Sequence, residues 1–225
     1  MTSRIAISQR VVENESYPET RDALALDWAR WVAEVLPRAA LLPVPNLPES
    51  VEAWWGAVAP EALFLSGGND LGSAPARDDT ERRLLACARR AHVPVLAVCR
   101  GMHVVNDYFG GRLERDLRTV TPSTHVARDH AVSLAAGSMR KLADNAASIA
   151  VNSFHGQGIV ASGVAASLSA FAVAEDGVVE GVVHREEPIV GVQWHPERAG
   201  PNAGFDERLT KTLLGEGAFW RNDRS

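Results

Sequence analysis

Short apolar runs alternate with longer helical patterns through the first half of this 225-residue chain. The apolar runs are too short for helices and are bounded by Pro, Gly or Ser, as buried strands are; they span residues 4–8, 39–44, 62–66 and 94–98. Helices are expected over residues 19–36, 78–91 and 101–109. Strands that alternate with helices pair in parallel under helical cover. The sequence therefore predicts an α/β fold in which helices cover both faces of a doubly wound, mostly parallel central sheet.

The second half of the chain has a different rhythm. The apolar runs "ASIAVNS", "SLSAFAVAED", "GVVEGVVHR" and "PIVGVQW" follow one another across short turns such as Asp176-Gly177, and a helix is expected at about 206–220. Because short turns join antiparallel strands, we expect a smaller, partly antiparallel strand set here. The sequence shows no repeat, low-complexity segment or linker, so residues 1–225 are predicted to form a single domain.

Composition disfavours several classes of partner. The formal net charge is −5 and the basic residues are scattered, so neither nucleic acid nor an anionic membrane is expected to bind. The sequence has no apolar run of the roughly 18 residues that a membrane span needs, and its N-terminus lacks the apolar core of a signal peptide. We therefore expect a cytoplasmic protein. In that reducing compartment its two cysteines are not expected to form a disulfide framework.

One cysteine, Cys99, stands between the strand 94–98 and the helix 101–109. Strand, sharp turn and helix are the context of a nucleophile elbow. The free N–H groups of a helix N-terminus also favour a thiolate. Position alone leaves open a small buried thiol that packs as an apolar residue, which is our interpretation of Cys87 in the middle of a helix.

His195 and Glu197 follow another apolar strand, in "PIVGVQWHPE". Residues i and i+2 beyond a strand point the same way, so Glu197 is placed to hold the His195 ring and fix its tautomer. A lone histidine at a strand end is more often solvated, but Cys99 at another strand end favours catalysis. By contrast, His125, His130 and His184 have no metal-ligand spacing and are interpreted as structural or surface residues; no metal site is predicted.

Two adjacent glycines, Gly67 and Gly68, end the strand 62–66. Glycine lets the backbone adopt unusual conformations and brings bare N–H groups close to a ligand. With the N–H of Arg100, either glycine would form an oxyanion hole. A double glycine by itself more often marks only a turn.

Four segments of the chain, in this order, carry a resemblance: "LFLSGGNDLG", "PVLAVCRGMHVVNDYFGG", "VNSFHGQGI" and "VGVQWHPE". They resemble the landmarks of the class I glutamine amidotransferase-like superfamily, and Cys-Arg-Gly is similar to its free-standing, peptidase C26-like γ-glutamyl hydrolase branch. The resemblance implies a flavodoxin-like fold and hydrolysis of a γ-glutamyl amide without metal or cofactor. Cys99 would be the nucleophile, His195 the base and acid, and Glu197 the orienting carboxylate.

The resemblance also implies substrate contacts. Residues Asn152, Ser153, Phe154 and His155 would line the pocket for the glutamyl group. Members of the superfamily usually carry Gln four residues after the cysteine, where this chain has His103. Either His103 keeps the donor role through a ring N–H or the glutamyl head group is held differently.

The segment "ISQRVVENESYPETRDALALDW", with "LSGGNDLG" and "WHPER", is more similar to γ-glutamyl-CDP-amidate hydrolases of capsular phosphoramidate biosynthesis than to γ-glutamyl-GABA hydrolases of polyamine catabolism. A nucleotide leaving group needs cationic donors, for which Arg10, Arg21 and Arg100 are candidates and Arg10 is chosen. For any one of these arginines taken alone, a solvated surface residue is the preferred interpretation. Three alternatives stay open: the γ-glutamyl-GABA hydrolase, a glutaminase subunit that supplies ammonia to a synthetase partner, and a non-catalytic binding protein. A homodimer is also left open.

Overall fold

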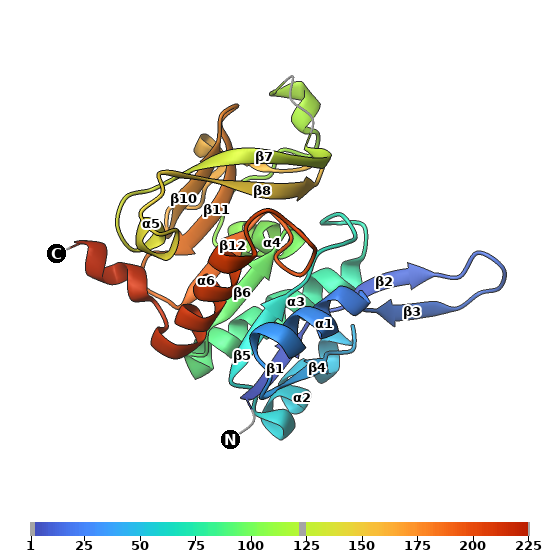
Figure 1. The fold of residues 1–225 in the computed structure, drawn as a ribbon. Helices are drawn as coiled ribbons and strands as arrows, with labels where there is room; N and C mark the ends of the chain where they lie inside the picture. The colour runs from blue at the N-terminus through green and yellow to red at the C-terminus, as the bar shows by residue number, and fades with distance from the viewer. Residues whose placement is uncertain (1–2, 122–124, 225) are drawn as a thin grey trace.

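A mixed sheet runs through the computed structural model, which describes residues 3–121 and 125–224 (Figure 1). Its strands are β1 (Ser3–Ile7), β4 (Ala39–Pro43), β5 (Ala62–Leu65), β6 (Val95–Val98), β7 (Val126–Leu134), β8 (Ser148–Phe154), β9 (Ile159–Val160), β10 (Leu168–Ala174), β11 (Val178–His184) and β12 (Ile189–Val192). The helices are α1 (Leu26–Val35), α2 (Val51–Val58), α3 (Pro75–Ala91), α4 (Arg100–Tyr108), α5 (Ser138–Leu142) and α6 (Ala203–Glu216). Within the described ranges, no helix is both long and apolar enough to cross a bilayer.

The main sheet has the strand order β4-β1-β5-β6-β12-β11-β10-β7-β8, and β9 pairs with β11. The strands from β4 to β12 in this order are parallel to one another. The strands that follow, all from the C-terminal half, are antiparallel. This confirms the predicted α/β class, with a parallel centre and a smaller antiparallel set.

Apolar side chains alternate between the two faces of the parallel strands. Ile5 and Ile7 of β1 pack in one core layer with buried side chains of α1 and α6, whereas Ala6 faces the layer that α2, α3 and α4 cover (Figure 1). Every second residue of a strand points to the same face, so a short, wholly apolar strand can supply both layers. This arrangement leaves the ends of the parallel strands for polar residues.

The prediction of a helix over residues 19–36 is wrong for the first part of that range. Residues Thr20–Ala23 form a strand, β3, that pairs antiparallel with β2 (Arg10–Glu13), and α1 begins only at Leu26. Figure 1 shows this hairpin extending away from the main sheet. The later apolar positions of the predicted helix, Trp28 and Trp31 among them, are buried as expected.

Contacts with two loops explain why residues 20–23 are extended. The side-chain amide of Asn69 accepts a hydrogen bond from the Val11 N–H at 2.8 Å and donates one to the Val11 carbonyl at 2.9 Å. Asp22 accepts hydrogen bonds from the backbone and side chain of Asn46 at 3.0 and 2.7 Å. Such tertiary contacts override a weak local helix preference.

Two further helices, α2 and α6, differ from the predictions. Helix α2 lies in a segment for which no helix was predicted, and α6 spans Ala203–Glu216 instead of about 206–220. Helix ends are the least certain part of a sequence pattern, because the last turn depends on tertiary contacts as well as on periodicity.

Candidate active site

Cys99 lies in the sharp turn between β6 and α4. Its backbone has φ 53° and ψ −107°, a conformation that L-residues rarely adopt. Gly101, two residues after Cys99, makes this turn possible because it lets the start of α4 lie close to β5. A Cβ on Gly101 would lie 2.4 Å from the carbonyl oxygen of Leu65 in β5. The strand, strained turn and helix thus form the predicted elbow, with Cys99 only 8% exposed.

His195 and Glu197 lie just beyond β12, the parallel neighbour of β6. The two strands are in register at Val98 and Val192, so their carboxyl ends meet at one edge. The His195 Nδ1 atom is 2.7 Å from Glu197 Oε1, and both side chains are buried. Because a carboxylate oxygen only accepts, the His195 ring donates its Nδ1–H to Glu197. The other ring nitrogen, Nε2, is then left for the side of the Cys99 thiol. The predicted i, i+2 arrangement is therefore present.

Asn152 fixes the backbone of His195. Its amide oxygen accepts a hydrogen bond from the His195 N–H at 2.8 Å, and its NH₂ group donates to the His195 carbonyl at 2.9 Å. Burial lowers the pKa of the His195 ring, but hydrogen bonds with Cys99 and Glu197 outweigh burial and raise this pKa to about 9. The ring is therefore protonated at neutral pH.

Gly67 and Gly68 close the site from the end of β5. A Cβ on Gly67 would lie 2.9 Å from the Cε1 atom of His195 and 3.6 Å from the Cβ of Cys99, so only glycine fits between them. The buried Arg77 side chain holds this loop by donating to the Gly67 carbonyl at 3.0 Å. The glycine loop therefore lies against both the thiol and the imidazole.

The Arg100 guanidinium is already paired inside the protein. This buried group forms ion pairs with Asp78 and Glu81 of α3. This corrects the expectation that the guanidinium of Arg100 is available to a nucleotide at the edge of the sheet. Only the backbone N–H of Arg100, which follows the elbow, remains as its contribution to an oxyanion hole.

A cavity of about 170 Å³ opens over Cys99. Among the predicted site residues, the cavity is lined by Gly68, Cys99, Arg100, His103, Phe154 and His155. Asn152 and Ser153 do not line it: Asn152 holds His195, and the buried Ser153 hydroxyl donates to the His125 carbonyl at 2.6 Å.

The two arginines of the β2–β3 hairpin differ in position. Arg10 lies against Gly68, because a Cβ on that glycine would be 2.5 Å from the Arg10 Nε atom. Arg21 is instead exposed and pairs with Glu19 at 2.5 Å. The structure therefore brings the predicted Arg10, and not Arg21, against Gly68, which lines the cavity.

His103 is linked to the thiol through Gln193, a residue that sequence reasoning missed. The ring Nε2 is 2.7 Å from the Gln193 amide oxygen, and the Gln193 NH₂ group donates to Cys99 Sγ at 3.6 Å. An amide oxygen only accepts, so Nε2 carries the ring proton. Burial lowers the pKa of His103 to about 4, which keeps the ring neutral. The signal for Gln193 was its place in "VGVQWHPE", directly after β12.

The chain is similar to several known proteins. Gamma-glutamyl-CDP-amidate hydrolase of Campylobacter jejuni is 30% identical over 200 residues, 86% of this chain and 90% of that protein. Gamma-glutamyl-gamma-aminobutyrate hydrolase PuuD of Escherichia coli K12 is 29% identical over 178 residues, 73% and 66% of the two chains. The glutaminase domain of Trypanosoma brucei CTPS with bound acivicin has the same fold, with TM-score 0.69 and 16% identity over 97% of this chain and 96% of that one.

A family model for peptidase C26 matches residues 5–197. This match includes the glycine loop, the elbow and the strand end that carries His195 and Glu197. Because it spans most of the sequence, the chain belongs to the peptidase C26 family.

Proposed function

We propose that this hydrolase of the peptidase C26 family cleaves a γ-glutamyl amide by covalent catalysis at Cys99. The observation that carries the proposal is that a cysteine in a strained elbow, which lines a cavity, lies beside a histidine that is hydrogen-bonded to a carboxylate. Nucleophile, base and orienting group are the parts that cysteine-dependent acyl transfer needs. The names of the relatives, both γ-glutamyl hydrolases, support the same reaction class.

In the first half of the reaction, the Cys99 thiolate attacks the γ-carbonyl carbon and a C–S bond forms. Backbone N–H groups of the glycine loop and of Arg100 stabilise the oxyanion. The C–N bond then breaks as His195, protonated at neutral pH because its pKa is raised to about 9, gives its proton to the leaving amine. The products of this half are a γ-glutamyl thioester and the free amine or amidate.

In the second half, the neutral His195 ring takes a proton from water as the water oxygen attacks the thioester. The C–S bond breaks, glutamate leaves, and the thiolate and imidazolium are restored. Glu197 keeps the ring in one tautomer throughout, through its 2.7 Å contact with Nδ1. Every proton in this cycle is carried by the chain or by water.

We propose γ-glutamyl-CDP-amidate as the substrate. Arg10 lies against Gly68, a residue of the cavity wall, and its guanidinium would pair with the phosphates of a nucleotide leaving group. The Campylobacter jejuni relative, whose name carries this substrate, also shares the greater length with this chain.

The test compares glutamate release from γ-glutamyl-CDP-amidate, γ-glutamyl-GABA and glutamine by the purified protein. The nucleotide substrate is expected to give the highest kcat/KM. Arg10→Ala should raise KM for that substrate about tenfold, since a charge-assisted hydrogen bond is lost, and should leave KM for γ-glutamyl-GABA unchanged. Arg21→Ala, on the same hairpin but paired with Glu19, is the matched control and should behave like the parent.

Other outcomes would contradict the substrate. A clear preference for γ-glutamyl-GABA would favour the second relative's activity. Hydrolysis of glutamine only when a synthetase is added would favour an ammonia-supplying subunit. Failure of every γ-glutamyl amide, with the protein folded, would overturn the reaction class itself.

A further inference from the structure

Three histidines surround a buried glutamate beside the active site. His125 directly precedes β7, His130 lies within β7, His155 directly follows β8, and Glu180 lies in β11. These four residues are here called the His–Glu cluster. Glu180 is completely buried, and the side chains of His125 and His155 are 4% and 2% exposed. Sequence spacing gave no sign of the cluster, because its members come from separate antiparallel segments.

The cluster is not held together by hydrogen bonds. Glu180 Oε1 lies 3.3 Å from His125 Nδ1 and 3.4 Å from both His130 Nε2 and His155 Nε2. Charge-assisted N–H···O bonds are shorter, about 2.7–2.9 Å. Within the described part of the chain, these nitrogens and both Glu180 oxygens have no hydrogen-bond partner. A buried carboxylate that accepts no hydrogen bond is strongly unfavourable.

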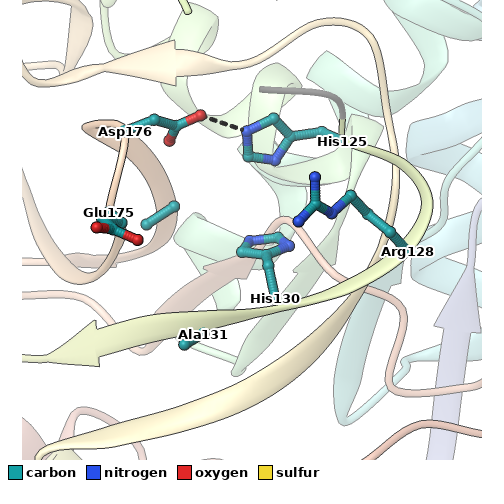
Figure 2. A pocket seen from close by; sticks show the side chains of 7 residues that line it. His125, Arg128, His130, Ala131, Glu175 and Asp176 are labelled. Carbon is teal, nitrogen blue, oxygen red and sulfur yellow. Dashed lines mark hydrogen bonds and ion pairs between the residues drawn. The ribbon is translucent and has the colours of Figure 1, made fainter. Parts of the chain in front are cut away.

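Outer contacts fix the tautomers of two rings. His155 Nδ1 is 2.8 Å from the Gln157 carbonyl, which only accepts, so Nδ1 carries the proton. His125 Nε2 is 2.8 Å from Asp176 Oδ2 (Figure 2), which likewise accepts. In the neutral rings, the lone pairs of His155 Nε2 and His125 Nδ1 therefore face an anionic oxygen. Lone pairs and a carboxylate repel one another unless a cation lies among them.

The spacing fits a tetrahedral cation. Ligand atoms around a zinc ion with bonds of about 2.0–2.1 Å lie about 3.3–3.4 Å apart, the separation found between Glu180 Oε1 and each ring. The ligand atoms of His125, His155 and Glu180 all lie within 4.8 Å of one another. The outer contacts of His125 with Asp176 and of His155 with a carbonyl are those that orient metal-bound histidines.

We propose that His125, His155 and Glu180 bind a zinc ion, with His130 as the fourth group. Imidazole and carboxylate in tetrahedral array are a donor set suited to zinc. The formal charges of Zn²⁺, Glu180 and Asp176 sum to zero, which removes the unfavourable charge of the buried carboxylates. A cavity of about 200 Å³, lined by His125, His130 and Asp176 with Arg128 at its wall, gives an entry path (Figure 2).

The zinc ion would tie the antiparallel half of the sheet to the catalytic cavity. His155 belongs to both places, because it also lines the cavity over Cys99. The metal lies outside the reaction itself: it fixes the cavity wall that follows β8. This role does not depend on which γ-glutamyl amide is the substrate.

The test titrates zinc into chelator-treated protein against a chromophoric competitor. Cys99→Ala serves as the background, so that the thiol cannot bind metal. We expect one zinc per chain and a zinc-dependent rise in melting temperature. Glu180→Gln and His125→Gln should each weaken binding at least about a hundredfold, more than the loss of an outer contact does. His92→Asn, an exposed histidine outside the cluster, is the matched control and should bind like the background protein.

A variant with intact ligands covers the case in which Glu180→Gln fails to fold. Asp176→Asn leaves the proposed ligands in place, removes the negative charge that faces His125 Nε2 and should weaken zinc about 10–100-fold. In Co²⁺-loaded protein, visible bands of tetrahedral intensity are expected without a thiolate charge-transfer band. Zinc affinity that Asp176→Asn and His125→Gln leave unchanged, a melting temperature indifferent to zinc, or weak octahedral cobalt bands would overturn the proposal.

Discussion

Cys99 holds its thiol in a backbone conformation that a side chain disfavours. With φ 53° and ψ −107°, the residue lies outside the common regions for L-amino acids. Such conformations cost on the order of 1–3 kcal/mol and persist only where the surroundings impose them. Here the hydrogen bond from the Cys99 N–H to the Val192 carbonyl, at 2.7 Å, ties the turn to the neighbouring strand.

This strain leads to a prediction for two variants of Cys99. Cys99→Ala and Cys99→Gly should both abolish turnover, since no thioester can form. Cys99→Gly should unfold with a free energy about 1 kcal/mol higher than Cys99→Ala, because glycine relieves the positive φ. Turnover is followed by steady-state glutamate release and stability by urea unfolding.

The control for the Cys99 variants is Cys87→Ala, which removes a buried thiol of α3 outside the cavity and should keep a normal rate. A normal rate in Cys99→Ala would end the covalent mechanism. A lower stability of Cys99→Gly than of Cys99→Ala would show that the elbow is not strained.

At the scale of elements, α4 packs closely on β5 through Gly101. Gly101→Ala would place a methyl group 2.4 Å from the Leu65 carbonyl oxygen, and backbone cannot easily move. We expect a loss of about 1–3 kcal/mol in the free energy of unfolding, as for overpacked interiors. Activity should fall as well, because α4 carries the N–H that follows Cys99.

Gly56→Ala is the matched control for this prediction. Gly56 lies in α2, and a Cβ there would meet nothing within 4 Å. Since alanine favours a helix by about 0.5–1 kcal/mol over glycine, this variant should be slightly more stable than the parent. Equal stabilities of the two alanine variants would contradict the close approach at Gly101.

The β2–β3 hairpin is joined to the glycine loop through Asn69. Asn69→Ala removes both hydrogen bonds to Val11 and should free the base of the hairpin that carries Arg10. We expect a higher KM for the nucleotide substrate with a smaller change for γ-glutamyl-GABA, measured by initial rates. Asn14→Ala, farther along the hairpin, is the control, because the Asn14 side chain bonds within the hairpin itself, for example to the Ser16 N–H. A KM unchanged by Asn69→Ala would separate the hairpin from recognition.

For the whole molecule, two buried groups make stability depend on pH. Burial raises the pKa of Asp206 from 3.8 to about 7, although a hydrogen bond from Trp194 opposes this, and the pKa of His195 is raised from 6.5 to about 9. In both cases the folded pKa exceeds the unfolded one. The stabilisation is therefore complete below the unfolded pKa and is lost as pH rises through the folded pKa.

Melting temperature should accordingly fall from mildly acidic pH toward pH 9. Asp206→Asn keeps an acceptor for the Trp194 N–H, found at 2.8 Å, and removes the buried charge. The variant should exceed the parent in stability above about pH 7, by on the order of 1 kcal/mol, and match it more closely at low pH. If the difference in melting temperature between parent and variant stays the same at every pH in this range, the prediction is contradicted.

The candidate catalytic residues could be found from the sequence because each directly follows an apolar strand. Carboxyl ends of parallel strands meet at one edge, so Cys99 and His195 were expected together despite their distance along the chain. A residue's place at a strand end does not determine the direction in which its side chain points. Arg100 turns to α3 and Ser153 turns into the interior, because buried ion pairs and hydrogen bonds decide these orientations.

The His–Glu cluster and the hairpin could not be predicted for a different reason. Both depend on antiparallel register, which brings His130 of β7 and Glu180 of β11 together across one intervening strand, β10. Register comes from pairing and turn geometry, and a list of apolar runs does not contain it. The hairpin was missed because the helical pattern of α1 was extended back over residues 20–23, whereas α1 begins only at Leu26.

Strand β12 is central in the sheet, yet it follows every other strand in the chain. During synthesis, β6 therefore emerges long before the partner that covers its open edge. Unpaired apolar edges on a growing chain invite association with other chains. Until β12 inserts between β6 and β11, the nascent sheet exposes such an edge. The same insertion brings His195 to Cys99, so a ribosome-bound chain that lacks β12 carries a thiol without its base.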